Sequence, residues 1–227
     1  MAERGVLGKS DLITFLFDFD GTLADSLLTI VEITNRLAPE FGYRPTPLEE
    51  VDALKGFSTR QLIRYSGIPL LKIPALLRRL RVELKAHGTP IAPCAGMPAI
   101  IRQLHAQNHA LAVITSNTPE MVHAFLAAHA LDHCFFSVDG GGTLFGKGKL
   151  IAKCLVRYRL VPNKTVYVGD EVRDIQAARF AGIRSVSVTW GFNSREALAT
   201  AQPDWLVDDP GALPAIAQTL SDREFGT

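Results

Sequence analysis

The sequence predicts an α/β fold, in which helices cover both faces of a doubly wound parallel sheet and an all-helical unit is inserted after the first strand. Three observations lead to this prediction. Short runs rich in β-branched and aromatic residues alternate with helical patterns along most of the chain, an order that forms parallel sheets. One long connection has helical patterns and no convincing strand. The 227 residues, 47% apolar and 21% charged, are enough for one core with a smaller second lobe.

Strands are expected where short apolar runs end at polar residues or glycine. LITFLF is the first of these runs, and ALAVIT, TVYVG and RSVSVT have a similar composition. Buried parallel strands show such continuous apolar runs because both of their faces are covered. The predicted strands are 12–17, 110–115, 134–138, 165–169, 184–189 and 205–207.

Helices are expected between these strands. Thr118-Pro119-Glu120 is typical of a helix start, because a threonine hydroxyl can cap the first amides and proline fits the first helical position. The predicted helices of this part of the chain are 96–107, 118–129, 147–160, 171–181 and 194–201.

The connection after the first strand departs from this alternation. A structureless loop of its length is unusual in a compact domain, and prolines divide it into four stretches with helical patterns: 26–41, 47–54, 58–66 and 70–86. We therefore assign residues 26–91 to an inserted helical unit and residues 1–25 with 92–227 to the α/β core. Asp25 and Ser26 are expected to cap the first inserted helix.

Composition and charge exclude several classes of protein. A formal net charge of +1 gives no general attraction to nucleic acid or to an anionic membrane surface. Cys94, Cys134 and Cys154 lack a CxxC pair and the six histidines show no metal spacing, which argues for a reducing compartment and against disulfides or a zinc site. No apolar run reaches the roughly 18 residues of a membrane span, and the start MAERGVLGKSD lacks the apolar centre of a signal peptide. We expect a cytoplasmic protein, and the sequence does not predict its oligomeric state.

Polar side chains gather where the predicted strands end. In an open parallel sheet the ligand site lies beyond the carboxyl ends of the strands, so residues far apart in sequence converge there. The candidate site residues are Asp18 and Asp20 after the first strand, Thr115, Ser116 and Asn117 after the second, Lys147 at the start of a helix, and Asp170 with Asp174 after the fourth strand. Carboxylates this close together repel one another unless a cation lies among them. Carboxylate oxygens with few other protein ligands suit Mg²⁺, which keeps several waters and accepts phosphate oxygens.

The same segments resemble the four signature motifs of the haloacid dehalogenase superfamily. These segments are DFDGTLADS at 18–26, ITSN at 114–117, the lysine of FGKGK at 145–149 and VGDEVRDIQAARFAG at 168–182. The similarity covers residues 12–190 and is strongest to the phosphoglycolate phosphatase-like members. It implies a Rossmann-like catalytic core with a mobile helical cap at the position of the insertion. The stretch PCAG at 93–96 resembles the family's small-residue junction between cap and core.

The resemblance also implies catalytic roles for four residues. Asp18 would be the nucleophile that forms an aspartyl-phosphate, and Asp20 would act as general acid and then as general base. Lys147 and the Thr115 hydroxyl would neutralise and orient the transferring oxygens.

The metal ligands follow from the same resemblance. It implies that Mg²⁺ is bound by the side chains of Asp18, Asp20 and Asp170 together with the backbone carbonyl of Phe19. Asp174 is either a further ligand or a carboxylate that orients the other groups.

Two further assignments stay open in the sequence. Ser116 and Asn117 either contact the substrate phosphate or shape the turn after the second strand. Lys149 competes with Lys147 for the role of the catalytic lysine, and Phe145-Gly146-Lys147 agrees better with the family pattern.

Substrate choice is expected to depend on the cap. The segment Lys55-Gly56-Phe57-Ser58-Thr59-Arg60 would face the crevice. Lys55 or Arg60 could pair with a substrate carboxylate, such as that of phosphoglycolate, and an ordinary solvated loop is the alternative.

We interpret the sequence as that of a Mg²⁺-dependent phosphatase, a phosphoric monoester hydrolase acting on a small phosphorylated metabolite, with phosphoglycolate as a candidate. Asp20 separates it from the dehalogenases, which lack an acid at that position. A phosphomutase similar to β-phosphoglucomutase is one alternative, because it uses the same motifs. A catalytically silent binding or regulatory protein of the same fold is the other, and the retained aspartates and lysine argue against it.

Overall fold

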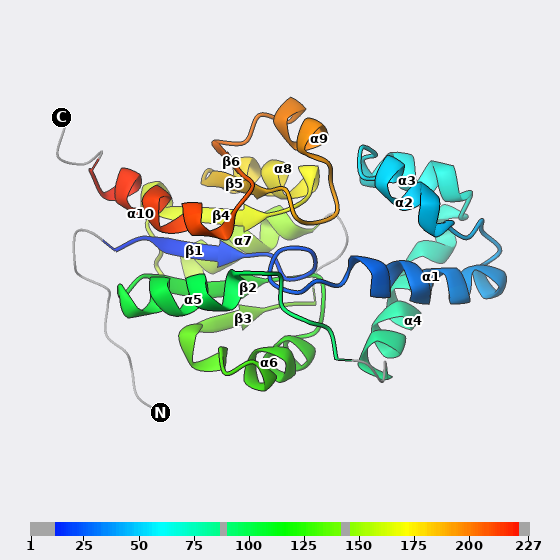
Figure 1. Cartoon of the computed structure of the whole chain (residues 1–227), viewed down its shortest axis with the longest axis horizontal. Coiled ribbons are helices and arrows are strands. Elements are labelled where there is room, and N and C mark those ends of the chain that lie inside the picture. The colour runs from blue at the N-terminus through cyan, green and yellow to red at the C-terminus, as the bar shows by residue number, and fades with distance from the viewer. Residues whose placement is uncertain (1–11, 87–89, 142–145, 223–227) are drawn as a thin grey trace.

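The computed structural model describes residues 12–86, 90–141 and 146–222. These residues contain a six-stranded parallel sheet in the order β3-β2-β1-β4-β5-β6 (Figure 1). The strands are β1 (Thr14–Phe17), β2 (Ala110–Ile114), β3 (Ser137–Asp139), β4 (Thr165–Gly169), β5 (Arg184–Val188) and β6 (Trp205–Val207). The chain builds one half of the sheet outward from β1 and the other half outward from β4. The winding therefore reverses between β1 and β4, where ligands bind in sheets of this kind.

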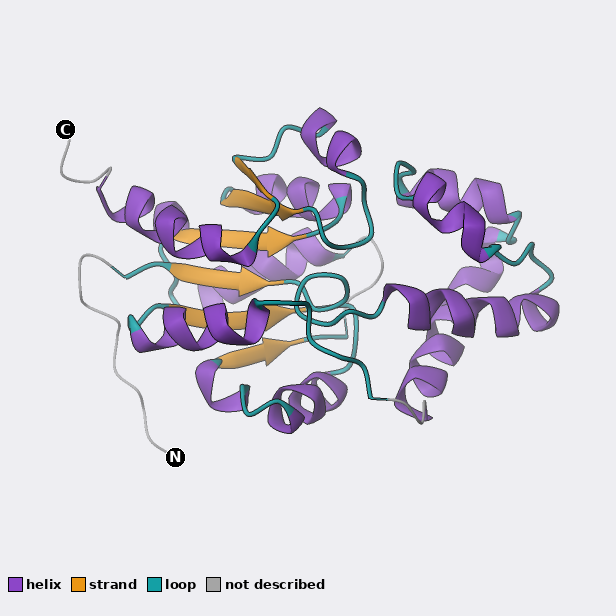
Figure 2. Cartoon of the chain, viewed as in Figure 1, coloured by secondary structure: helices purple, strands orange, loops and turns teal. Residues whose placement is uncertain are grey.

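Helices cover both faces of this sheet, as Figure 2 shows. The helices of the α/β core are α5 (Met97–Ala106), α6 (Pro119–Ala128), α7 (Lys147–Arg157), α8 (Val172–Ala181), α9 (Arg195–Thr200) and α10 (Leu213–Asp222). The helices between β1 and α5 are α1 (Leu27–Phe41), α2 (Val51–Leu54), α3 (Thr59–Ser66) and α4 (Ile73–Ala86), and we call residues 26–91 the cap. Short 3₁₀ turns precede α2 and α4 at Leu48–Glu50 and Leu70–Lys72.

The two faces of the sheet bury separate hydrophobic clusters. Phe15 and Phe17 of β1 point to the cluster formed with α5, α6 and α10, whereas Leu16 points to the cluster formed with α7 and α8. This alternation follows from the period of two along a strand. Strand β1 is buried over its whole length between β2 and β4. The chain that follows Phe17 therefore leaves the sheet at its centre.

The cap has a small hydrophobic cluster of its own. Ile33, Leu37 and Phe41 lie on one face of α1 and pack against Leu84 of α4. Their spacing of four residues places them on the same face of an amphipathic helix. Figure 1 shows the cap beside the core at the carboxyl ends of the strands, with α1 and α4 crossing.

The two segments that connect cap and core are paired with each other. Asp25 N donates to Ala92 O at 2.9 Å, and Cys94 N donates to Leu23 O at 2.9 Å. Ala24 and Pro93 form an antiparallel bridge between these bonds. The chain therefore enters and leaves the cap through one short ribbon, which fixes where the two units join.

The predicted fold class is confirmed, and the differences are local. The strand predicted at 134–138 is displaced, because Asp132–Cys134 form a 3₁₀ turn and β3 begins at Ser137. The prediction did not include α10. The boundaries at 25/26 and 91/92 stay predictions. Residues 1–11, residues 87–89 and Phe145, on which parts of the sequence analysis relied, lie outside the described residues. Among the described residues, no helix combines the length and apolarity that crossing a membrane requires.

Candidate active site

The loop after β1 folds back on itself directly beyond the sheet. The amides of Leu23 and Ala24 donate to the carbonyl of Phe19 at 2.9 and 3.0 Å, which closes a tight turn. Gly21 has a φ of 74°, and a Cβ at this position would lie 2.3 Å from Asp170 Oδ2. Glycine is therefore required both by the left-handed backbone and by the close approach of Asp170.

This turn argues against one of the metal ligands that the resemblance implied. The Phe19 carbonyl, which the resemblance implied as a ligand, accepts backbone hydrogen bonds within the loop from Thr22, Leu23 and Ala24. Its lone pairs are engaged by these amides. We therefore leave the Phe19 carbonyl out of the proposed ligand set.

A buried lysine joins two of the predicted carboxylates. Lys147 Nζ, at the start of α7, donates to Asp18 Oδ2 at 2.6 Å and to Asp174 Oδ1 at 2.5 Å. All three side chains are at most 7% exposed. Burial lowers the pKa of Lys147, but Asp174 and Asp18 outweigh this effect, so its pKa is raised and the amine stays charged. Lys149, in contrast, is exposed, so the geometry favours Lys147 as the catalytic lysine.

Asp18 is buried at the centre of this cluster. Its Oδ1 accepts the amide of Phe19 at 2.8 Å, so both of its oxygens have partners. Burial raises the pKa of Asp18 to about 7, Lys147 opposes this shift and Asp174 adds to it. A carboxylate in this position needs further positive charge to stay ionised.

Asp170 is completely buried and held by the loops around it. Its Oδ1 accepts the hydroxyl of Thr22 at 2.8 Å, and its Oδ2 accepts the amide of Phe192 at 2.7 Å. Burial, reinforced by Glu171 and Asp174, raises the pKa of Asp170 well above its usual value. The loop that contains Gly191 and Phe192 approaches Asp170 closely, because a Cβ on Gly191 would lie 2.2 Å from Asp170 Oδ2.

Asp174 occupies the first turn of α8 and contacts groups on both sides. Its Oδ1 accepts Lys147 Nζ, and its Oδ2 accepts the backbone amide of Glu171 at 3.0 Å. Gly169 leaves room for it, since a Cβ there would lie 2.5 Å from Asp174 Oδ2. These contacts favour the alternative in which Asp174 orients the lysine.

Asp20 lies apart from this cluster. Its Oδ1 accepts the hydroxyl of Ser26 at 2.8 Å, and its Oδ2 accepts the side-chain amide of Asn117 at 2.6 Å. Burial raises the pKa of Asp20, and the bonds from Ser26 and Asn117 partly oppose the shift. A raised pKa suits a carboxyl that must carry a proton at neutral pH. The oxygens of Asp20 thus face Ser26 and Asn117, which does not support its predicted role as a metal ligand.

One of these contacts differs from the sequence expectation, and another bears on an alternative that the sequence left open. Ser26 precedes α1 but makes no side-chain capping bond to it, because its hydroxyl donates to Asp20 instead. Asn117, for which phosphate contact and turn formation were both open, holds Asp20 with its side chain and forms the turn with its backbone amide, which donates to Thr115 Oγ1 at 3.0 Å. Thr115 is buried at the end of β2, and Ser116 beside it is half-buried.

The acidic cluster fits a hard divalent cation. Asp18, Asp170 and Asp174 each bring a carboxylate oxygen to within 4.8 Å of the others. Oxygen ligands of this kind match Mg²⁺, and the Lys147 ammonium offsets only part of their charge. The raised pKa values of Asp18 and Asp170 describe the same imbalance, since an added cation would restore both to the ionised form.

A second group of possible ligands lies elsewhere in the core. His105 of α5 and the adjacent His133 and Cys134 bring their donor atoms within 4.8 Å of one another. No sequence spacing indicated this group, because the fold brings His105 to a turn more than twenty-five residues away in the chain. Imidazole and thiolate donors suit softer metals than Mg²⁺, so this group is separate from the acidic cluster.

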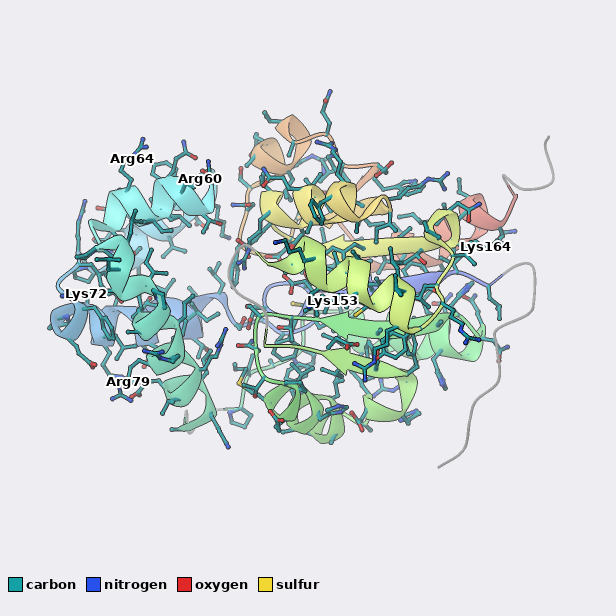
Figure 3. All side chains as sticks on the ribbon, turned by 180° about the vertical axis from the view of Figure 1, so that it is seen from behind. Arg60, Arg64, Lys72, Arg79, Lys153 and Lys164 are labelled. Atoms are coloured by element: carbon teal, nitrogen blue, oxygen red, sulfur yellow. The ribbon has the colours of Figure 1, made fainter. Side chains whose placement is uncertain are left out.

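The two predicted specificity residues lie in the cap. Lys55 follows α2, and its Nζ pairs with Asp52 Oδ1 at 3.1 Å. Arg60 is exposed on α3, and Figure 3 shows it on the side of the cap nearer to the core, with Arg64 farther away. The structure thus places Lys55 in a turn that contacts the core through its backbone carbonyl, and it places Arg60 on the next helix of the cap.

Fold and site together define a capped α/β protein with a buried cluster of carboxylates and a lysine at the switch point of its sheet. Residues 15–188 match the haloacid dehalogenase-like hydrolase family, and the chain belongs to this family. It is 36% identical over 206 residues to a phosphoglycolate phosphatase of Synechococcus elongatus, covering 90% of this chain and 97% of that protein. It is 32% identical over 224 residues to a phosphoglycolate phosphatase of Xylella fastidiosa, covering 94% and 96%.

The solved structures agree with this fold. A haloacid dehalogenase-like hydrolase family protein from Streptococcus pneumoniae superposes with a TM-score of 0.75 at 21% identity, covering 92% of this chain and 99% of that one. The predicted family, with its phosphoglycolate phosphatase-like character, and the predicted enzyme class, a phosphoric monoester hydrolase, are confirmed.

Proposed function

We propose that this enzyme is a Mg²⁺-dependent phosphatase that hydrolyses a small phosphorylated metabolite through an aspartyl-phosphate on Asp18, with phosphoglycolate as the substrate. The observation that carries the proposal is the buried contact of Lys147 with both Asp18 and Asp174, next to Asp170. A buried ion cluster of this kind is costly for stability, and its chemistry matches what phosphoryl transfer requires. Hydrolysis of phosphoglycolate is the activity named for the two relatives above.

Metal binding is assigned to the acidic cluster. Asp18 and Asp170 would hold Mg²⁺, and Asp174 would orient Lys147 beside them. When bound, the ion supplies positive charge that keeps Asp18 ionised and reduces its repulsion of the substrate phosphate.

In the first step, an oxygen of Asp18 attacks phosphorus while the bond from phosphorus to the leaving oxygen breaks. Asp20 donates its proton to that leaving oxygen, for which its raised pKa prepares it. Ser26 and Asn117 hold the Asp20 carboxyl in one orientation. Lys147 and Thr115 orient the phosphoryl oxygens, because phosphoryl transfer depends on positioning and on electrostatic stabilisation.

In the second step, water attacks phosphorus of the aspartyl-phosphate. Asp20, now ionised, accepts a proton from that water. The bond between phosphorus and the Asp18 oxygen breaks, which releases inorganic phosphate and restores both carboxyl groups to their starting state.

Specificity for phosphoglycolate is assigned to the cap. The free carboxylate of phosphoglycolate would pair with the Lys55 or Arg60 side chain, because a positive charge beside the site favours an anionic substrate. The cap would also exclude bulk water from the transfer step.

The test is a screen for phosphate release across a panel of phosphorylated metabolites, with Mg²⁺ and with EDTA. We expect the highest kcat/KM for phosphoglycolate, loss of activity in EDTA and recovery with Mg²⁺. Transfer of the phosphate to a second sugar phosphate instead of water would identify a phosphomutase. Release from no member of the panel, or full turnover in chelated enzyme, would contradict the proposal.

A further inference from the structure

The loop between β5 and α9 contains a buried asparagine that contacts both the cap and the core. Asn193 is 6% exposed. Its side-chain nitrogen donates to the backbone carbonyl of Lys55 at 3.0 Å and to that of Phe57 at 3.1 Å. An amide nitrogen carries two protons, so both are used by the cap. These carbonyls are 138 and 136 residues away in the sequence.

The same side chain also reaches the helix that carries Asp174. Its Oδ1 accepts the amide of Val172 at 2.9 Å, the first residue of α8. The first amides of a helix have no partner within the helix. Asn193 Oδ1 therefore supplies the acceptor that the Val172 amide lacks within α8. This bond fixes the Asn193 side chain relative to the acidic cluster.

The backbone around Asn193 holds the neighbouring metal-site carboxylate. Its own amide donates to the Asp170 carbonyl at 3.2 Å, and the preceding amide, of Phe192, donates to Asp170 Oδ2 at 2.7 Å. The following amide, of Ser194, donates to the Lys55 carbonyl at 2.8 Å. Three consecutive residues thus bind Asp170 on one side and the cap loop on the other.

We propose that Asn193 is a positioning residue that docks the specificity loop of the cap, Lys55–Phe57, onto the loop that holds Asp170. The proposal rests on the phosphatase function above, and it adds the contact that sets the position of the cap over the reacting groups. Because the docking bonds end on backbone carbonyls, substitution of the side chains at 55 and 57 would leave these bonds in place.

Asn193→Asp separates docking from the helix contact. A carboxylate keeps an acceptor for the Val172 amide, but it has no proton for the carbonyls of Lys55 and Phe57 and repels them instead. We expect this variant to fold, and to dock the cap poorly. Asn193→Ala removes both contacts.

Asn35 provides a matched control within the cap. Its side-chain nitrogen donates to the Thr46 carbonyl at 2.6 Å and its Oδ1 accepts the Thr46 amide at 2.7 Å. Asn35→Ala therefore removes a similar pair of side-chain to backbone bonds without touching the core.

The first readout needs no turnover. Spin labels on Arg64→Cys in the cap and Lys153→Cys in the core, both exposed and on separate units (Figure 3), report the cap–core distance. The three native cysteines are buried. We expect one narrow distance distribution with Asn193 and a broader, longer one in Asn193→Asp and Asn193→Ala, with no change in Asn35→Ala.

The second readout compares the loss of kcat/KM for two substrates. Loss of two hydrogen bonds should lower kcat/KM for phosphoglycolate about 10- to 100-fold, and less for p-nitrophenyl phosphate, which has no carboxylate for the cap to recognise. Equal losses for the two substrates, or distances like those of the control, would overturn the docking role. If the wild-type protein were inactive on phosphoglycolate while the Asn193 variants showed the predicted distance changes, the proposed substrate would be wrong and the docking role would be supported.

Discussion

Replacing Gly191 by alanine should displace Asp170 and weaken the proposed metal site. A Cβ at residue 191 would lie 2.2 Å from Asp170 Oδ2 and 2.3 Å from its Cβ. Ordinary contact begins at 3.4 Å, so the atoms must separate by about 1.2 Å. Because one of the opposing atoms is a Cβ, a side-chain rotation cannot relieve the clash, and the loop or the end of β4 has to move.

The size of the effect follows from that displacement. A misplacement of about 1 Å at a catalytic constellation costs about 10²-fold in rate. The bond from the Phe192 amide to Asp170 would lengthen as well, leaving a buried carboxylate short of a donor. Overpacking of this kind also lowers the free energy of unfolding by about 1–3 kcal/mol.

The assay is phosphate release as a function of Mg²⁺ concentration, with thermal unfolding measured alongside. Gly182→Ala is the control, because Gly182 ends α8 with a φ of 72° and a Cβ there would meet no atom within 4 Å. Alanine at this position costs about 1–2 kcal/mol through its left-handed backbone and leaves the site unchanged. We expect Gly191→Ala to need more Mg²⁺ and to turn over about 10²-fold more slowly. If Gly191→Ala matched Gly182→Ala in both respects, the proposed role of Asp170 in metal binding would be wrong.

Three further predictions concern charge, proton transfer and the cap. Burial raises the pKa of Asp18 from 3.8 to about 7, so the folded metal-free protein binds more protons than the unfolded chain and loses stability as pH rises through this range. Calorimetry should therefore find a larger rise in Tm on adding Mg²⁺ at pH 8 than at pH 5. An equal rise at the two pH values would contradict the assignment of Asp18 as a metal ligand. Asp20→Asn should slow phosphoglycolate turnover about 10²–10⁴-fold with substrate binding largely retained; a rate near wild type, with reversion by deamidation excluded by mass spectrometry, would remove Asp20 from the mechanism. Lys55→Ala and Arg60→Ala should change the ratio of kcat/KM between phosphoglycolate and uncharged-alcohol phosphates more than they change Mg²⁺ dependence, and unchanged ratios would mean that substrate choice lies outside this loop.

Much of the fold could be predicted because its signals are local. Continuous apolar runs such as TVYVG mark strands that are buried on both faces, and β4 occupies the predicted residues 165–169. The helix α10 was missed although Leu213, Ile216 and Leu220 are spaced as one apolar stripe. The stripe is short, and its partner, α5, lies more than a hundred residues away in the sequence. Local patterns do not show such a contact.

The site could be predicted only in part for the same reason. The motif segments place Asp18, Asp170 and Lys147 at strand ends and at a helix start, and parallel strands bring those ends together. What holds the carboxylates depends on loop geometry. Thr22 and the Phe192 amide bind Asp170, and neither has a sequence pattern that indicates this contact. Ser26 had the position of a helix cap, but its hydroxyl bonds to Asp20, which lies closer in the folded loop.

Trapping the covalent intermediate tests the central claim most directly. In Asp20→Asn, p-nitrophenyl phosphate should still phosphorylate the enzyme, since its leaving group needs no proton, while the base for the second step is missing. The aspartyl-phosphate should then accumulate, and borohydride should reduce it to homoserine. We predict that peptide mass spectrometry finds homoserine at residue 18 after incubation with Mg²⁺ and this substrate, and none in EDTA. A burst of nitrophenol with residue 18 unmodified, or with the modification at another residue, would contradict the assignment of Asp18 as the nucleophile.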